Sequence, residues 1–303
     1  MSARSLIKRL AESATTTLGV VRASERANRH GVAVLSYHNI VPEGEASIGD
    51  VSLHLPVRTF REHLDCLQAH YRVVGLDRLG DPHDGTAPRV AITFDDAYCG
   101  AVVTGLAELA RRRLPATVFV SAGLLDRRSF WWDRLSDEEG RIPIGRRDHA
   151  LWHLAGADQA VREWMADEGM REREIPEHAL SATRAELSSA IAVSDVTIGA
   201  HGWDHLNMAA LSAAQLAQEC AKPAESLRGD WTSYRPWVAY PYGLSSDTVV
   251  AAAADHYRLG FRIDGGLARV EEIADRPLAV ARINVPAGLS ARGLRLRVSG
   301  LRT

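Results

Sequence analysis

The chain has 303 residues, 46% of them hydrophobic, so it is long enough to bury a large core. Its formal net charge of −2 and pI of about 6.6 give no basic surplus, so we expect no nucleic-acid partner. The three cysteines are widely spaced and form no C-x-x-C pair, so neither a disulfide framework nor a thiolate zinc site is indicated.

The N-terminal residues carry basic side chains but only a short apolar stretch at 18–21, which is not the pattern of a signal peptide. No uninterrupted apolar run approaches the ~20 residues needed to cross a bilayer. We therefore expect a soluble, cytoplasmic protein with no transmembrane segment. Residues 5–26 could form a basic amphipathic helix. Packing on the domain is the favoured interpretation of that helix, and peripheral membrane contact is the minority one.

Short runs rich in β-branched residues recur between helix-like segments along the chain. They cover residues 32–37, 71–74, 89–94, 117–121, 196–200, 237–240, 257–263 and 278–285. Helix signals lie between them: Phe60, Leu64 and Leu67 repeat at helical spacing, and 183–186 and 212–215 read as capping boxes. Strands that alternate with helices predict a parallel α/β sheet.

The rhythm of strands and helices is broken at residues 127–191, which hold several tryptophans among many charged residues. We expect a helical insertion there, after the fourth strand. The predicted organisation is an N-terminal helical segment at 1–30, a barrel at 31–290 that contains this insertion, and a C-terminal tail at 291–303.

Polar side chains fall at or just past the end of the strand-like runs: His38, Asp95, Asp96, Ser121, His201 and Tyr242. In a β/α barrel the carboxyl ends of the strands carry the active site. A doubly wound sheet also places ligands there, but the sequence contains neither G-x-G-x-x-G nor a P-loop. A barrel is therefore the favoured architecture.

Asp95 and Asp96 come directly after the apolar, strand-like run that includes residues 90–92, and His201 and His205 follow another strand-like run at residues 196–200. An Asp-Asp pair taken alone is most often a turn that caps backbone N–H groups. Two ionised carboxylates side by side are costly unless a cation or a shared proton offsets their repulsion. Two histidines and one carboxylate are the protein ligands typical of a catalytic zinc with an open position.

These motifs resemble the polysaccharide deacetylase family, also called carbohydrate esterase family four, over residues 32–285. The family motif T-F-D-D corresponds to Thr93–Asp96, its H-x-x-x-H to His201–His205, and its third motif to Tyr240–Gly243. Of two weaker matches, residues 35–38 resemble the Y-H strand that opens many members, and residues 130–133 resemble a motif of the branch whose third motif reads A-Y-P-Y-G.

The resemblance implies a distorted (β/α) barrel with fewer than eight strands and a metal-dependent enzyme that removes N-acetyl groups from amino sugars of the cell envelope. It implies that Asp95 is the general base and that Asp96, His201 and His205 bind the metal. The candidates for oxyanion and substrate binding are Tyr242, through its backbone N–H, together with Tyr240 and Trp132.

The chain departs from the family pattern at two positions. Ala239 stands where the third motif more often has an arginine, so Arg282 or Arg235 must orient Asp95. We prefer Arg282 because its strand should end near the barrel mouth. The late motif also lacks the histidine that serves many members as general acid. We assign that role to His38, whose alternative is to hold the loops of the metal site.

Zinc is the expected metal, although cobalt, nickel or iron would suit the same ligands. The expected substrate is an N-acetylated sugar of a glycan or a glycan precursor. Two alternatives remain open at this stage. One is a hydrolase that cleaves an amide or ester on another small, lipid-linked or nucleotide-linked sugar. The other is a glycan-binding module that has lost turnover.

Overall fold

The computed structural model of the protein describes residues 19–82 and 87–301, and a strongly curved sheet forms its centre. Most strands of this sheet are short and buried. They are β1 (Gly31–Tyr37), β4 (Arg72–Val73), β5 (Arg89–Phe94), β6 (Ala116–Val120), β7 (Val196–Ala200), β8 (Tyr234–Ala239), β9 (Leu259–Arg262), β10 (Ala268–Arg269), β11 (Val280–Ala281) and β12 (Ile283–Asn284). A separate pair consists of β2 (Asn39–Val41) and β3 (His54–Pro56).

The sheet follows the order β10-β1-β5-β6-β7-β8-β9-β11, and every pairing along it is parallel except the antiparallel pair β1–β10. One short segment brings its two edges together, because β11 pairs with β9 while β12, two residues later, pairs with β1. The sheet is therefore a nearly closed, distorted (β/α) barrel, as the sequence predicted, but it contains ten strands in the described residues where fewer than eight were expected, because short strands such as β4, β10, β11 and β12 add to it.

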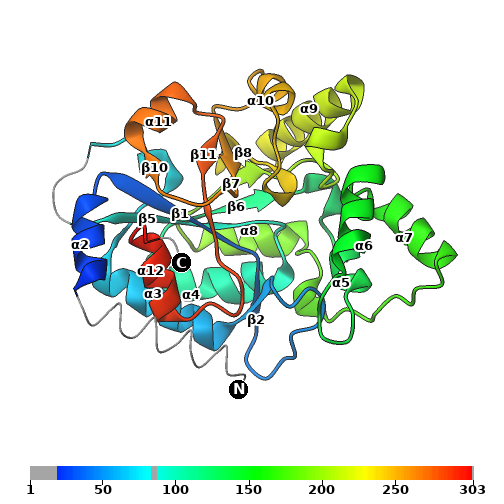
Figure 1. The fold of residues 1–303 in the computed structure, drawn as a ribbon, viewed down its shortest axis with the longest axis horizontal. Coiled ribbons are helices and arrows are strands. Elements are labelled where there is room, and N and C mark those ends of the chain that lie inside the picture. The colour runs from blue at the N-terminus through cyan, green and yellow to red at the C-terminus, as the bar shows by residue number, and fades with distance from the viewer. Residues whose placement is uncertain (1–18, 83–86, 302–303) are drawn as a thin grey trace.

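Helices surround the barrel, and an additional group of helices lies at one end of the molecule (Figure 1). The surrounding helices are α2 (Val20–Ala27), α3 (Val57–His70), α4 (Leu106–Arg112), α8 (Arg184–Ala192), α9 (Ala213–Asp230), α10 (Asp247–Ala253), α11 (Val270–Asp275) and α12 (Ala291–Val298). The additional group contains α5 (Trp131–Leu135), α6 (Ile144–Asp148) and α7 (Asp158–Asp167), with the π-helical turn η4 (His149–His153) between the last two. All of this group falls within the predicted insertion.

Local sequence signals placed several elements correctly. The runs 89–94 and 196–200 coincide with β5 and β7, and both predicted capping boxes form, at the starts of α8 and α9. The apolar repeat Phe60, Leu64 and Leu67 is the buried face of α3. Burial of such a stripe against the sheet stabilises each surrounding helix more than intrinsic helix propensity does.

Two segments differ from the expectation. The run 278–285 forms two strands instead of one, because Arg282 separates β11 from β12 and their partners differ. Residues 291–298 are helix α12, with Leu294 and Leu296 buried, where a tail was expected. The first part of the helix expected at 5–26, residues 5–18, lies outside the described part of the chain, and the remainder overlaps α2.

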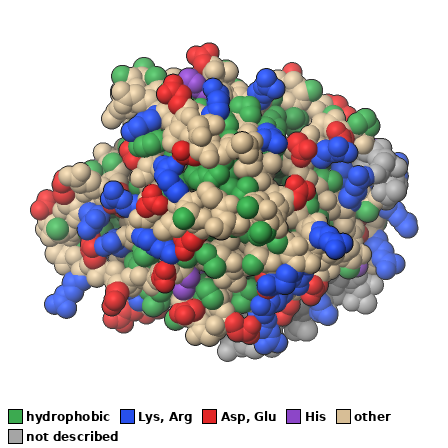
Figure 2. Space-filling view, turned by 180° about the vertical axis from the view of Figure 1, so that it is seen from behind, with side chains coloured by type: hydrophobic (Ala, Val, Ile, Leu, Met, Phe, Trp, Pro, Cys, Tyr) green, Lys and Arg blue, Asp and Glu red, His purple; other side chains and the backbone are tan. Residues whose placement is uncertain are grey.

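The surface carries both signs of charge. On the face seen in Figure 2, acidic and basic side chains are intermixed. None of the helices in the described residues combines the length and the apolar character that crossing a membrane requires.

Candidate active site

A cavity of about 160 Å³ lies at the carboxyl ends of the parallel strands. Its wall combines residues from several strand ends and from the insertion: His38, Asp50, Ser52, Leu53, Asp95, Asp96, Trp131, Trp132, Arg147, His201, His205, Tyr242, Ile263 and Asn284. A larger groove of about 660 Å³ also includes Ile263 and Asn284 in its lining, so the two hollows adjoin there. The barrel thus brings the predicted strand-end residues to one place.

Asp95 is held by a buried two-pronged ion pair. Nη1 and Nη2 of Arg282 donate to its two carboxylate oxygens at 2.7 and 2.8 Å, and Ser36 Oγ donates to Oδ2 at 3.0 Å. Burial alone would raise the pKa of Asp95, but the guanidinium beside it holds that pKa well below its usual range. Asp95 is therefore ionised and fixed in orientation at neutral pH.

The backbone turns sharply where the site residues follow their strands. Asp96 has φ 68°, Ala97 has φ 53°, His205 has φ 55° and Tyr242 has φ 59°, all in the left-handed region that side chains with a Cβ rarely adopt. In an extended strand Asp95 and Asp96 would point to opposite faces. The left-handed turn lets both line the same cavity, and strain of this kind is typical of functional sites.

Asp96, His201 and His205 converge on one point. Asp96 Oδ1 lies 3.0 Å from His205 Nε2 and 3.6 Å from His201 Nε2, and the two Nε2 atoms are 3.2 Å apart. Ligands about 2.0–2.1 Å from a tetrahedral Zn²⁺ are separated from one another by about 3.4 Å. His201 Nδ1 donates to the Ala239 carbonyl at 2.7 Å, which leaves Nε2 free to bind. The three atoms therefore fit a divalent cation.

The protonation states of these residues also suit a cation. Burial lowers the pKa of His201 and lowers that of His205 to about 3, so both imidazoles are neutral at pH 7. Burial raises the pKa of Asp96 to about 6, and the neighbouring Asp95 charge adds to that effect. Within the described residues Asp96 Oδ1 and His205 Nδ1 are buried without a hydrogen-bond partner. A cation would offset the unpaired charge on Asp96.

Aromatic rings enclose His205. The Trp132 ring centroid lies 4.7 Å from that of His205, and the Tyr242 ring meets His205 edge-on at 4.5 Å. Trp131 Nε1 donates to the Tyr242 hydroxyl at 3.0 Å, and Trp132 Nε1 donates to Tyr98 at 2.7 Å. Trp132 and Tyr242 both line the cavity, where their predicted roles would place them. The hydrogen bonds and ring contacts described above hold both side chains in position.

Other predicted residues divide between the cavity and the core. His38 lines the cavity and is partly buried. The expectation that Tyr240 binds substrate is corrected, because its side chain is fully buried and donates to the Leu278 carbonyl outside the cavity.

Ser121 supports the His201 loop by donating to the His201 carbonyl. Arg235 is exposed and bonds to backbone carbonyls near its own strand, so Arg282 is the arginine that contacts Asp95.

Among the residues that the sequence analysis did not single out, Ser36 contacts Asp95, and Asp50 and Arg147 line the cavity. Ser36 precedes His38 by two residues on a strand, and that spacing, which puts both on one face of the sheet, could have revealed it. Asp50 and Arg147 come from a loop and from the insertion, where no local pattern points to a site.

Comparisons with known proteins agree with this picture. A family model described as polysaccharide deacetylase matches residues 83–258. No curated protein matches the chain. Among solved structures, the Streptococcus pyogenes deacetylase PplD in complex with acetate is 17% identical, with a TM-score of 0.61 over 88% of this chain and 98% of that one.

Two further structures are similar. A polysaccharide deacetylase from Bacillus cereus is 15% identical, with a TM-score of 0.63 over 88% of this chain and 69% of the other. IcaB from Ammonifex degensii is 20% identical, with a TM-score of 0.59 over 89% and 97%. At these identities the likeness shows a shared fold.

Proposed function

The chain belongs to the polysaccharide deacetylase family of hydrolases that act on amide bonds of sugars, and from that premise we propose that it removes N-acetyl groups from amino-sugar residues with the help of a divalent metal. The observation that carries the proposal is that two carboxylates with different partners line the same cavity. Asp95 is ion-paired to Arg282, whereas Asp96 faces two neutral histidines.

Asp96, His201 and His205 would hold the metal. When bound, it supplies Lewis-acid chemistry that polarises the amide carbonyl and lowers the pKa of water. Asp95, kept ionised by Arg282 and with its Oδ2 4.0 Å from His201 Nε2, would accept the proton of the attacking water. The backbone N–H of Tyr242 donates to the oxyanion that develops as the carbonyl carbon becomes tetrahedral.

We propose that His38 delivers a proton to the departing amine. Support comes from its place in the cavity wall. Burial lowers the pKa of His38, which makes its protonated form a stronger acid than an exposed imidazolium. We expect His38→Gln to lower kcat at every pH in a full pH profile of turnover. A profile that matches the unmodified enzyme would remove His38 from this role.

Acetate release from N-acetylglucosamine oligomers, with added Zn²⁺ or Co²⁺, tests the whole proposal. We expect Asp95→Asn to lower kcat by about 10²–10⁴-fold while oligomer binding persists. Asp204→Asn is the matched control, since Asp204 is exposed and lies within the same histidine motif. Binding without release by both the unmodified protein and Asp95→Asn would indicate a glycan-binding module instead.

The metal and the exact substrate need separate measurements. Metal analysis of the purified protein, with His201→Ala for comparison, should show loss of the bound metal in the variant, and zinc is the metal we expect. Deacetylation of polymeric, lipid-linked and nucleotide-linked N-acetyl sugars, measured side by side, would identify the substrate class. Turnover of only the linked precursors would favour the alternative hydrolase considered for this sequence.

A further inference from the structure

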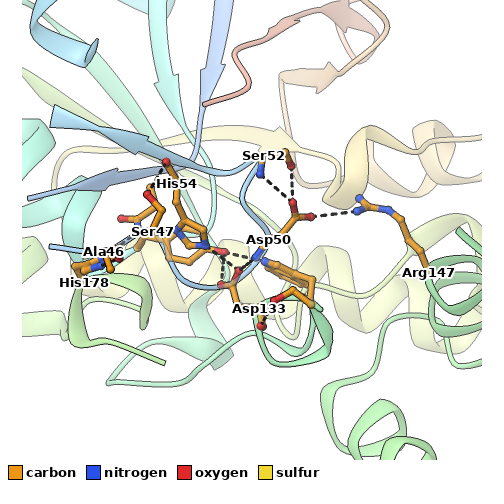
Figure 3. Close-up of polar contacts among 12 residues, drawn as sticks. Ala46, Ser47, Asp50, Ser52, His54, Asp133, Arg147 and His178 are labelled. Atoms are coloured by element: carbon orange, nitrogen blue, oxygen red, sulfur yellow. Dashed lines mark hydrogen bonds and ion pairs between the residues drawn. The ribbon is translucent and has the colours of Figure 1, made fainter. Parts of the chain in front are cut away.

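Asp50 and Arg147 face the catalytic cavity but take no part in the chemistry proposed above. Asp50 lies in the loop between β2 and β3, and Arg147 lies in α6 of the insertion. Both line the cavity that contains Asp95 and the two histidines. Figure 3 shows the Arg147 side chain extending from its helix toward the Asp50 carboxylate, which lies between Arg147 and Ser52.

The Asp50 carboxylate is rigidly placed. Its Oδ1 accepts hydrogen bonds from Ser52 Oγ at 2.7 Å and from the Ser52 N–H at 3.0 Å. Its own N–H donates to Asp133 Oδ1 at 2.8 Å, and His54 Nε2 donates to that same oxygen at 2.9 Å. Gly49 makes this approach feasible, since a Cβ there would lie 2.4 Å from Asp133 Oδ1. The network leaves Asp50 Oδ2 directed at Arg147.

The Arg147 guanidinium makes fewer hydrogen bonds than the Asp50 carboxylate does. Its Nη1 lies 3.4 Å from Asp50 Oδ2, longer than the roughly 2.7–2.9 Å of a strong charge-assisted hydrogen bond. The Arg147 side chain is 43% exposed and the Asp50 side chain 10%. The described part of the chain gives this guanidinium no second hydrogen bond, although it carries five N–H groups. Donors therefore remain for a ligand in the cavity.

We propose that Asp50 and Arg147 form a recognition pair for hydroxyl groups of the sugar that carries the N-acetyl group. This inference rests on the proposed function. A hydroxyl both donates and accepts, so it can donate to Asp50 while accepting from Arg147. A phosphate or carboxylate on Arg147 would lie beside the Asp50 carboxylate and be repelled. The pair therefore favours neutral sugar residues over phosphorylated ones.

Kinetics on two kinds of substrate test the pair. N-acetylglucosamine oligomers present hydroxyl groups, whereas 4-nitrophenyl acetate presents only an acetyl group. We expect Arg147→Gln and Asp50→Asn each to raise KM for the oligomers about tenfold, and to lower kcat/KM for the oligomers far more than kcat/KM for the aryl ester. Arg146→Gln, an exposed arginine one position away, should behave like the unmodified enzyme.

The outcomes are distinguishable. Equal losses on both substrates, or an unchanged KM for the oligomers, would overturn the recognition pair while leaving the deacetylase proposal intact. If the unmodified protein neither cleaves nor binds the oligomers in calorimetry, the proposed function fails and this inference fails with it. A preference for N-acetylglucosamine 1-phosphate over the methyl glycoside that disappears in Arg147→Gln would overturn the assignment to neutral hydroxyl groups.

Discussion

The pairing of Asp95 with Arg282 is fully removed from solvent, with exposures of 1% and 0% for the two side chains. Thr93 Oγ1 accepts a further hydrogen bond from Arg282 Nη1 at 3.1 Å. A buried ion pair gains little net stability over apolar residues, but removing one partner leaves an uncompensated charge. The pair is therefore best explained by the orientation and ionisation of Asp95 that it maintains.

Arg282→Gln should lower the free energy of unfolding by about 3–5 kcal/mol, because the Asp95 carboxylate loses its counter-charge in a buried site. Adding Asp95→Asn to that variant should recover part of this loss, since the unpaired charge is then absent. Urea unfolding of the two single variants and the double variant measures both effects.

Arg235→Gln is the control for the Arg282 substitution, because Arg235 is exposed on β8 and away from the cavity. It should change the free energy of unfolding by no more than about 0.5 kcal/mol. If the free energy lost in the Arg282→Gln, Asp95→Asn double variant equalled the sum of the losses in the two single variants, Arg282 and Asp95 would not be energetically coupled.

At the scale of elements, a buried histidine joins three segments. His63 of α3 accepts from the Tyr37 hydroxyl of β1 through Nδ1 at 3.2 Å, and its Nε2–H donates to the Leu289 carbonyl just before α12 at 3.0 Å. This arrangement uses the neutral ring, with one nitrogen as donor and the other as acceptor. Burial lowers the pKa of His63 to about 4.

The pH dependence of stability follows from that shift. Between pH 6.5, the ordinary pKa of histidine, and pH 4, the unfolded chain binds a proton at His63 that the folded protein excludes. The contribution is therefore complete above pH 6.5 and is lost as the pH falls toward 4, by about 3 kcal/mol in total. Free energies of unfolding, measured by denaturant titration at each pH, should fall by about 3 kcal/mol more between pH 6.5 and pH 4 in the unmodified protein than in His63→Gln. Parallel curves would show that His63 is not the group responsible.

The elements that sequence reasoning located are those with local signals. A buried apolar run followed by a polar turn marked β5 and β7, and side-chain caps marked α8 and α9. The two- and three-residue strands β2, β3 and β10 are defined by their pairing partners: β2 and β3 pair with each other across a loop, and β10 pairs with β1 at the other end of the chain. No local periodicity can encode such pairings, because a strand that short completes only about one side-chain alternation.

The same limit applies to the site. Asp95, Asp96, His201 and His205 were recognisable because each motif is contiguous and follows a strand. Asp50 and Arg147 reach the cavity only through a loop and an insertion whose placement depends on tertiary contacts. Tyr240 was misassigned because the chain leaves the strand in a tight turn at Pro241–Gly243, so Tyr240 and Tyr242 do not share a face as two residues at this spacing on a strand would; Tyr242 lines the cavity and Tyr240 is buried in the core.

At the scale of the whole molecule, Arg282 takes part both in barrel closure and in the ion pair with the proposed base. Arg282 is the single residue between β11, which pairs with β9, and β12, which pairs with β1. Its side chain crosses the interior to Asp95 at the end of β5. The segment that joins the two edges of the sheet therefore also fixes the proposed base, so mispairing of this segment would disable the site.

Metal binding should be visible in the stability of the whole protein. A ligand that binds only the folded state at 100 times its Kd stabilises it by about 2.7 kcal/mol. We expect Zn²⁺ to raise the Tm of the unmodified protein and of Asp204→Asn, but to have little effect on Asp96→Asn.

When a chelator removes the metal, Asp96→Asn should no longer have a lower Tm than the unmodified protein. Asp96 is 3% exposed and, without a cation, its charged carboxylate is buried among neutral histidines and the Asp95 charge. Asp96→Asn removes that cost. In the presence of a chelator the variant should therefore unfold at a temperature equal to or above that of the unmodified protein. With Zn²⁺ the unmodified protein should be the more stable of the two. Thermal unfolding in both conditions tests this crossing, and an equal rise in Tm on adding Zn²⁺ to both proteins would place the metal elsewhere.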